Sequence, residues 1–305
     1  MAGNSTRAIL FALGANLAIA IAKGVAAYFT KSGAMLAETV HSLADCGNQL
    51  LLLLGMKQAV RPASAEHPLG HGKAVYFWSF LVAVMLFTVG GMFSLYEGVH
   101  KLQHPEPLAK WWWAVGVLTF GIVAESVSTR AALQEAAKER EGRSLWRWFR
   151  ESRQAALIVI VGENLAALFG LIVALAAIVL TVLTGNPLWD AIGTIAIGVL
   201  LIVVAVFVAI EIKAMLIGQS ADPAREREIR AFVEAQPEVT RVLSLITLQL
   251  GGDVMLSAQV QMQGEQTLAS QVLHMDRIER ELKQRFPEVR WSFFEPDSVP
   301  ESADA

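Results

Sequence analysis

Two polar side chains stand one helical turn apart in an apolar stretch near the N-terminus. His41 and Asp45 occupy positions i and i+4 of segment 34–57, so in a helix both project from one face, which Glu38 shares. An imidazole nitrogen and a carboxylate oxygen so arranged can bind one divalent cation. Alternatively, they can hydrogen-bond and lock two helices together. Ionisable groups inside an apolar span usually face a partner or a water path, and this favours cation binding.

A second apolar segment, 155–183, supplies a complementary group. Glu163 is its one carboxylate, and Asn164 follows directly. A buried, unpaired carboxylate takes up a proton unless a cation or a histidine stabilises its charge. Neutral His41 with Asp45 and Glu163 carries a charge of −2, which balances a divalent ion. With the Asn164 carbonyl as fourth ligand, the sequence predicts a four-coordinate site between two helices.

A short loop offers a weaker candidate. His67 and His71 lie in the segment 66–73, which begins with Glu66 and also contains Pro68 and Gly70. Two histidines can bind a metal ion, but the proline and glycine disfavour a helical i,i+4 geometry. A loop metal site and an ordinary surface loop are equally compatible with this pattern.

Other polar residues within the apolar segments are interpreted as ties between helices. Lys23 could also snorkel to the membrane surface, and Asp190 is expected to cap the helix that follows Asn186 and Pro187. The full set is Asn16, Lys23, Glu97, Glu125 and Asp190.

These residues lie in a chain with the composition of a membrane protein. Of its 305 residues, 54% are hydrophobic and 17% charged, whereas soluble domains are nearer a quarter charged. A bilayer core of about 30 Å needs about 20 apolar residues per helix. We therefore predict an all-α bundle of six transmembrane helices in a transport domain over residues 1–217. The expected spans are 8–29, 34–57, 75–99, 111–130, 155–183 and 188–212.

Basic residues predict the orientation of this bundle. The connection between the fourth and fifth spans carries seven Lys or Arg residues, and the connection between the second and third carries three. By the positive-inside rule both termini are cytoplasmic, as in a multi-pass cell (inner) membrane protein. The N-terminal apolar run is too long for a cleaved signal peptide. The single cysteine, Cys46, excludes an internal disulfide, and the net charge of −3 gives no indication of nucleic-acid binding.

The sequence predicts a small α+β domain over residues 218–305. A helix from 222 to 235 is followed by strands 239–250 and 254–262, a helix 268–286 and a strand 289–294, giving the order αββαβ. Two helices would cover one face of a three-stranded sheet. A module of this size is small enough to gain stability from a dimer partner.

Together the motifs resemble the cation diffusion facilitators, the family that includes zinc transporters. The resemblance is carried by the stretches 41–45 and 67–73, the six predicted spans and the small domain. It implies a homodimer that exchanges divalent metal ions for protons and has a ferredoxin-like cytoplasmic domain. It also implies metal ligands at His41 and Asp45, and at His67 and His71 in the loop.

Two departures from the family pattern bear on selectivity and assembly. Glu163 and Ala167 stand where zinc exporters of the family carry His or Asp and, four residues later, Asp. This indicates a divergent branch with an acidic fifth helix and a harder ligand set, which moves selectivity toward manganese, iron or cobalt. His274 is the one histidine beyond position 104, so we expect the small domain to dimerise by apolar packing rather than through bridging metal.

The predicted function is proton-coupled efflux of a divalent cation from the cytoplasm by alternating access, with zinc favoured because His41 is present. A manganese, iron or cobalt transporter of the same fold and a non-transporting membrane metal sensor are the alternatives. An intramembrane metalloenzyme would need a HExxH helix, and none occurs in the sequence. We therefore expect no enzymatic activity and no resident cofactor, the partners being metal ions, protons, lipid and a second copy of the chain.

Overall fold

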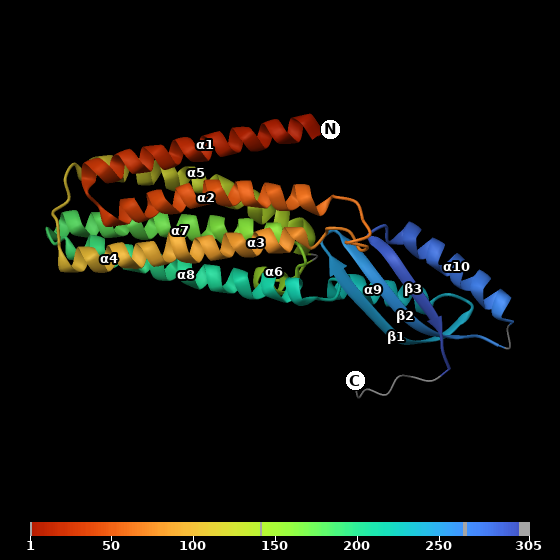
Figure 1. Cartoon of the computed structure of the whole chain (residues 1–305). Helices are drawn as coiled ribbons and strands as arrows, with labels where there is room; N and C mark the ends of the chain where they lie inside the picture. Colours follow the sequence, from red (N-terminus) through yellow and green to blue (C-terminus); the bar gives the residue numbers. More distant parts are fainter. Residues whose placement is uncertain (1, 141, 265–266, 299–305) are drawn as a thin grey trace.

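The computed structural model describes residues 2–140, 142–264 and 267–298, with the side chains of the first helix described from Gly14 onward, apart from Ala15. Long helices lie side by side in a bundle, and a small α/β unit adjoins one end of it (Figure 1). The bundle elements are α1 (Ala2–Thr30), α2 (Gly33–Ala59), α3 (Ala74–Met85), η1 (Leu86–Met92), α4 (Phe93–Gln103), α5 (Trp111–Arg140), α7 (Ala155–Thr184) and α8 (Leu188–Ile217).

Four helical stretches among the described residues are long and apolar enough to cross a membrane. They are Ala74–Gln103, Trp111–Arg140, Ala155–Thr184 and Leu188–Ile217, and Asn16–Thr30 forms a shorter apolar helix. Helix α2 carries Glu38, His41 and Asp45, which lower its hydropathy. The bundle is therefore mostly helical and apolar as expected, while four of the six predicted spans meet the criteria of length and composition.

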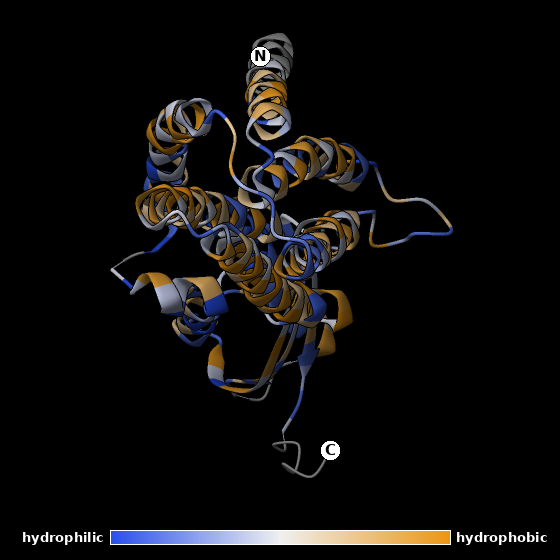
Figure 2. Cartoon of the chain, turned by 90° about the vertical axis from the view of Figure 1, so that its left-hand side faces the viewer, coloured by the Kyte–Doolittle hydropathy of each residue, from blue (hydrophilic) through white to orange (hydrophobic). Residues whose placement is uncertain are grey.

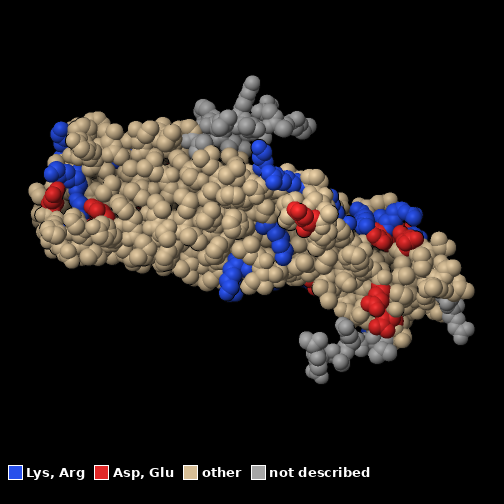
Figure 3. All heavy atoms as spheres, viewed as in Figure 1, with Lys and Arg blue, Asp and Glu red and all other residues tan. Residues whose placement is uncertain are grey.

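The outer surface of the bundle suits contact with lipid. The view along the bundle shows many hydrophobic residues in each of its helices (Figure 2). On α5, for example, Phe120, Val123 and Val127 are 65%, 62% and 67% exposed. On the face drawn in Figure 3, charged atoms gather near the ends of the bundle and leave a broad band of uncharged side chains between them.

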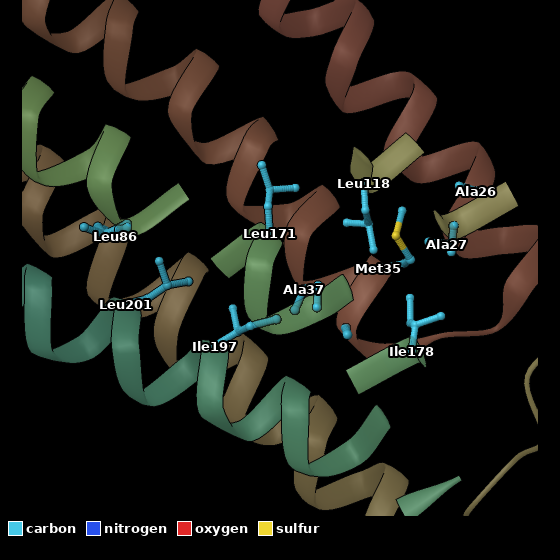
Figure 4. Close-up of a cluster of buried hydrophobic side chains, with 14 of the residues drawn as sticks. Ala26, Ala27, Met35, Ala37, Leu86, Leu118, Leu171, Ile178, Ile197 and Leu201 are labelled. Atoms are coloured by element: carbon cyan, nitrogen blue, oxygen red, sulfur yellow. The ribbon is translucent and has the colours of Figure 1, made fainter. Parts of the chain in front are cut away.

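The interior of the bundle is packed from small and branched residues. Leu118, Leu171, Ile197 and Leu201 come from three helices and meet in one cluster (Figure 4). Glycines let helices approach closely: a Cβ on Gly198 of α8 would lie 2.8 Å from the backbone nitrogen of Leu95. Membrane helices commonly associate through such small residues.

The third long helical stretch of the bundle, Ala74–Gln103, is not a uniform α-helix. Helices α3 and α4 are joined by the π-helical segment η1, which contains Gly90 and Gly91. Such π segments frequently occur at functional sites. Here the Cβ position of Gly90 lies 4.0 Å from Nδ1 of His41, so the irregular turn passes beside the predicted site.

The small unit has the predicted αββαβ order. Its elements are α9 (Pro223–Glu234), β1 (Val239–Leu250), β2 (Asp253–Met262), α10 (Leu268–Arg285) and β3 (Val289–Pro296). The strand order is β1-β2-β3, with β1 antiparallel and β3 parallel to β2. Both helices pack on one sheet face, where Ile229, Val233, Ile278 and Leu282 join the core.

A short helix in the charged connection was not predicted. Helix α6 (Leu145–Glu151) begins after Ser144, whose hydroxyl accepts a hydrogen bond from the Arg147 backbone nitrogen. It buries Trp148 completely and leaves Trp146 56% exposed. Seven residues are too few for a periodic pattern to emerge from a run rich in arginine.

The bundle and the small unit touch through polar and backbone contacts. The backbone nitrogen of Gly251, in the β1–β2 turn, donates to the Tyr76 hydroxyl at 2.9 Å. The Arg143 guanidinium donates to the Asp222 carboxylate at 2.8 Å. A Cβ on Gly251 would clash with the backbone of Gly72, so the hairpin turn rests directly on the loop that carries the predicted histidine pair.

The expectation that Asp190 caps its own helix is wrong. Asp190 accepts hydrogen bonds from the Gly33 backbone nitrogen at 2.7 Å and from the Ser32 hydroxyl at 2.5 Å. It therefore satisfies free N–H groups at the start of α2. The residue ties α8 to α2 and thereby fixes the helix that carries His41 and Asp45.

Candidate metal site in the helical bundle

Helix α2 holds His41 and Asp45 as the i,i+4 spacing predicts. Nδ1 of His41 lies 3.5 Å from Oδ1 of Asp45. The His41 ring is completely buried, and neither ring nitrogen makes a hydrogen bond to any described residue. Buried polar atoms are almost always satisfied in native proteins. An imidazole without hydrogen-bond partners beside a carboxylate is therefore a strong indication of a ligand or a proton-carrying role.

Helix α7 brings Glu163 against α2. Glu163 is 7% exposed, and its Oε1 accepts a hydrogen bond of 2.5 Å from the Asn48 amide of α2. Asn48 lies one helical turn beyond Asp45. The neighbouring Gly162 lets α8 approach, since a Cβ there would lie 3.0 Å from a methyl group of Val208. The carboxylate is thus held by one amide and by close helix packing.

A small polar cavity of about 70 Å³ connects three of the four predicted ligands. Asp45, Glu163 and Asn164 line it together. This volume is large enough for an ion together with water. His41 does not line this cavity but lies behind Asp45. The remaining lining residues are Asn16, Ile19, Lys23, Ser42, Gln49, Gly121, Glu125, Ser128, Ala167 and Leu171.

The four predicted ligands do not converge on one point in this conformation. Among the described residues, no group of three His, Cys, Asp or Glu side chains lies close enough to hold a metal ion. The Asn164 amide donates instead to the Ser128 hydroxyl of α5 at 3.1 Å. Bringing His41 into one coordination sphere with Glu163 therefore requires a rearrangement of these side chains or of the helices α2 and α7 that carry them.

Lys23 is not at the membrane surface, so the snorkelling interpretation is wrong. Its ammonium is 3.0 Å from Glu38 and 2.7 Å from the Ser42 hydroxyl, and the residue is 3% exposed. Glu38 thus neutralises a lysine of α1 through its Oε2 atom. The interpretation of Lys23 as a tie between helices is confirmed.

Glu125 is the cavity residue whose importance the sequence analysis missed. It lines the same cavity as Asp45 and Glu163, and its side chain makes no hydrogen bond or ion pair with any described residue, so it ties no helices together there. The available signal was a lone carboxylate in an apolar span, the same signal that identified Glu163.

The loop histidines lie side by side. The ring centroids of His67 and His71 are 4.3 Å apart, and Nδ1 of His71 is buried without a hydrogen-bond partner among the described residues. Gly70, with φ of 73°, makes the turn between them. Metal binding by this pair stays a prediction.

Comparison with known families identifies the fold's relatives. Residues 9–217 match the family described as the cation efflux transmembrane domain, and residues 221–291 match the cation efflux protein cytoplasmic domain. The chain belongs to the cation efflux family. This is the cation diffusion facilitator family that the motifs indicated.

Three relatives illustrate the range of the family. The mitochondrial proton-coupled zinc antiporter SLC30A9 of Mus musculus is 31% identical over 88% of the chain. Metal tolerance protein C4 of Arabidopsis thaliana is 28% identical over 90% of it, and the cation-efflux pump FieF of Klebsiella pneumoniae 26% over 92%. The chain spans 54% of the mouse protein, 61% of the plant protein and 89% of the bacterial pump. By name, the mouse protein is an antiporter and the bacterial protein an efflux pump.

Proposed function

We propose that this protein is a proton-coupled divalent cation transporter that exports zinc from the cytoplasm. The observation that carries the proposal is the polar cavity inside an apolar bundle, lined by Asp45, Glu163 and Asn164 and backed by the buried, unpartnered His41. Polar groups of this kind inside a membrane mark ion pathways. The zinc antiporter and cation-efflux pump among its relatives support the assignment.

The proposed mechanism follows from the protonation states that metal binding requires. A bound divalent ion needs neutral His41 and ionised Asp45 and Glu163. Protons arriving from the acidic side compete for the same groups and release the ion. Relative motion of α2 and α7 would gather the ligands for binding and separate them for release, as alternating access requires.

The proposed architecture is a transport domain over residues 1–217, with six spans, and a cytoplasmic domain over 218–305. The long apolar helices and the position of α1 and α2 within the same bundle support six spans. The excess of basic residues in the connections between spans two and three and between spans four and five supports cytoplasmic termini in a cell (inner) membrane.

The proposed assembly is a homodimer formed by apolar packing. The match to the cation efflux cytoplasmic domain supports it. The sheet face opposite α9 and α10 carries exposed Ile246 and Phe293, which are 60% and 57% accessible. Large apolar side chains gathered on one face favour burial against a second copy.

Manganese, iron or cobalt transport is the second candidate. The cavity lining favours it, because Asp45, Glu163 and Asn164 present oxygen atoms while His41 lies behind them. Oxygen ligands suit harder cations than a mixed nitrogen and oxygen set does. Flux of zinc, manganese, iron and cobalt in one assay should therefore measure both transport and metal selectivity.

The test is flux through the purified chain in proteoliposomes with an internal metal-sensitive dye and a proton gradient. We expect zinc uptake that depends on the gradient. The variants His41→Ala and Asp45→Ala should lower it at least about tenfold, since even second-shell losses cost that much. Zinc binding without flux would instead identify a metal sensor. Flux unchanged in both variants would refute the site.

A further inference from the structure

Glu125 of α5 lines the same cavity as Asp45 and Glu163. Two hydrogen bonds fix the position of α5 relative to α7. The Thr129 hydroxyl donates to the backbone carbonyl of Asn164 at 3.3 Å, and the side-chain amide of Asn164 donates to the Ser128 hydroxyl at 3.1 Å. Residues three and four apart share a helix face. Glu125 therefore projects from the side of α5 that binds α7.

No unpaired positive charge in the cavity lining balances the carboxylate of Glu125. Lys23 is the one cation in the cavity lining, and Glu38 and Ser42 already hold its ammonium. Three carboxylates, those of Asp45, Glu125 and Glu163, remain around about 70 Å³.

Glu163 itself points to a cationic ligand. It is more than nine-tenths buried, and Asn48 donates to Oε1, while Oε2 has no hydrogen bond to any described residue. Buried carboxylates need a cation or a proton to offset their desolvation.

Resting on the proposed function, we propose that Glu125 is a cation-contacting residue that biases the site toward hard divalent ions. With Glu125 the cavity is lined by four oxygen-bearing side chains, from Asp45, Glu125, Glu163 and Asn164. No three of the described acids converge on one point in this conformation, so binding one ion would draw these side chains together. Such a set favours Mn²⁺ over Zn²⁺ relative to a site completed by His41. Glu125 thus sets selectivity, whereas His41 contributes affinity for zinc.

Uptake of Zn²⁺ and Mn²⁺ by the full chain tests this inference. Glu125→Gln removes the charge and keeps the shape, and it should lower Mn²⁺ uptake roughly tenfold and Zn²⁺ uptake by less. Glu97→Gln is the matched control, because Glu97 lines a different cavity beside His100 and Lys101. It should leave both rates unchanged.

Equilibrium binding of Mn²⁺ to the detergent-purified chain, followed by electron paramagnetic resonance, separates this inference from transport itself. If the wild type carries neither metal but binds Mn²⁺ in a manner that depends on Glu125, the proposed function fails and the inference holds. If Glu125→Gln binds and carries both metals like the wild type, the inference is overturned. Should Glu125→Gln not fold, Glu125→Asp keeps the charge and should shift the preference toward Zn²⁺; an unchanged ratio would refute the inference.

Discussion

At the scale of single residues, the buried ammonium of Lys23 is unusual for a cation pathway. It lines the cavity that holds Asp45 and Glu163, yet Glu38 and Ser42 hold it at 3.0 Å and 2.7 Å. Glu38 in turn depends on Gly170, where any Cβ would collide with its carboxylate. The Lys23 ammonium is thus paired with Glu38 rather than with the acids that a transported ion would use.

We predict that Glu38→Gln inhibits transport by freeing the Lys23 ammonium to pair with the cavity acids. Metal uptake should fall roughly tenfold, and thermal stability should also fall, because breaking a buried ion pair costs about 3–5 kcal/mol. The double variant Lys23→Met/Glu38→Gln removes both charges and should recover much of the uptake. Uptake that is equally low in both variants would contradict the competition.

At the residue level, the sequence singles out side chains that are anomalous in their own segment, and metal binding by them stays a prediction. His41, Asp45 and Glu163 stand out in apolar sequence, and the structure brings Asp45 and Glu163 to one cavity. The partners of Lys23 and Asp190 could not be predicted, because helix packing alone selects them. Asp190 binds Gly33, which is 157 residues away.

At the scale of elements, close contact between α8 and the consecutive helical segments η1 and α4 depends on glycine. A Cβ on Gly198 would lie 2.8 Å from the Leu95 backbone nitrogen and 3.0 Å from the Gly91 carbonyl oxygen. We predict that Gly198→Ala forces the two helices apart and costs about 1–3 kcal/mol. Thermal unfolding in detergent measures this. Gly116→Ala, on α5, meets no atom within 4 Å and should not lower stability; equal losses in both would contradict the prediction.

Helix α6 is held by ionic hydrogen bonds that predict a pH dependence. Arg147 and Arg143 donate to the Glu151 carboxylate at 2.7 Å and 3.3 Å, and these bonds lower the pKa of Glu151. A lowered pKa means that the stabilisation is complete above the ordinary glutamate pKa of roughly 4.3 and is lost as the pH falls through the lower, folded value.

The variant Glu151→Gln should therefore be less stable than the wild type at pH 7 by about 1 kcal/mol or less. This difference should shrink below roughly pH 4. Thermal unfolding of both chains between pH 7 and pH 3.5 measures it. A gap that stays constant throughout would show that the Glu151 charge does not stabilise α6.

Element-level prediction was good for long periodic segments and poor for short ones. The long helices of the bundle and the αββαβ order follow from hydropathy and alternation. Neither helix α6 nor the π-helical segment η1 has a periodic sequence pattern of this kind. Helix α6 is stabilised by the Ser144 cap and by packing of the buried Trp148. Segment η1 lies where Gly90 and Gly91 meet α2 and α8.

At the scale of the whole molecule, the small domain leaves one sheet face uncovered by the helices of its own chain. Strand register aligns Ile246, Ser257 and Phe293 in one row across the three strands. The neighbouring row contains Leu248, Met255 and Trp291. Because α9 and α10 pack on the opposite face, these two rows form an apolar surface that a second copy of the chain would bury.

We predict that this surface, rather than a bridging metal, holds the proposed homodimer. Each large side chain buried there contributes about 1.5–3 kcal/mol, so the double variant Ile246→Glu/Phe293→Glu should weaken dimerisation at least about 100-fold. Mass photometry of the detergent-purified chain measures the shift to monomer. Leu273→Glu is the matched control, since Leu273 is 70% exposed on α10, away from the proposed interface.

The wild-type dimer should survive metal removal by a chelator, because His274 pairs with Glu238 at 3.2 Å and no second histidine lies beyond position 104. Dissociation by the chelator alone would establish a metal-bridged interface instead.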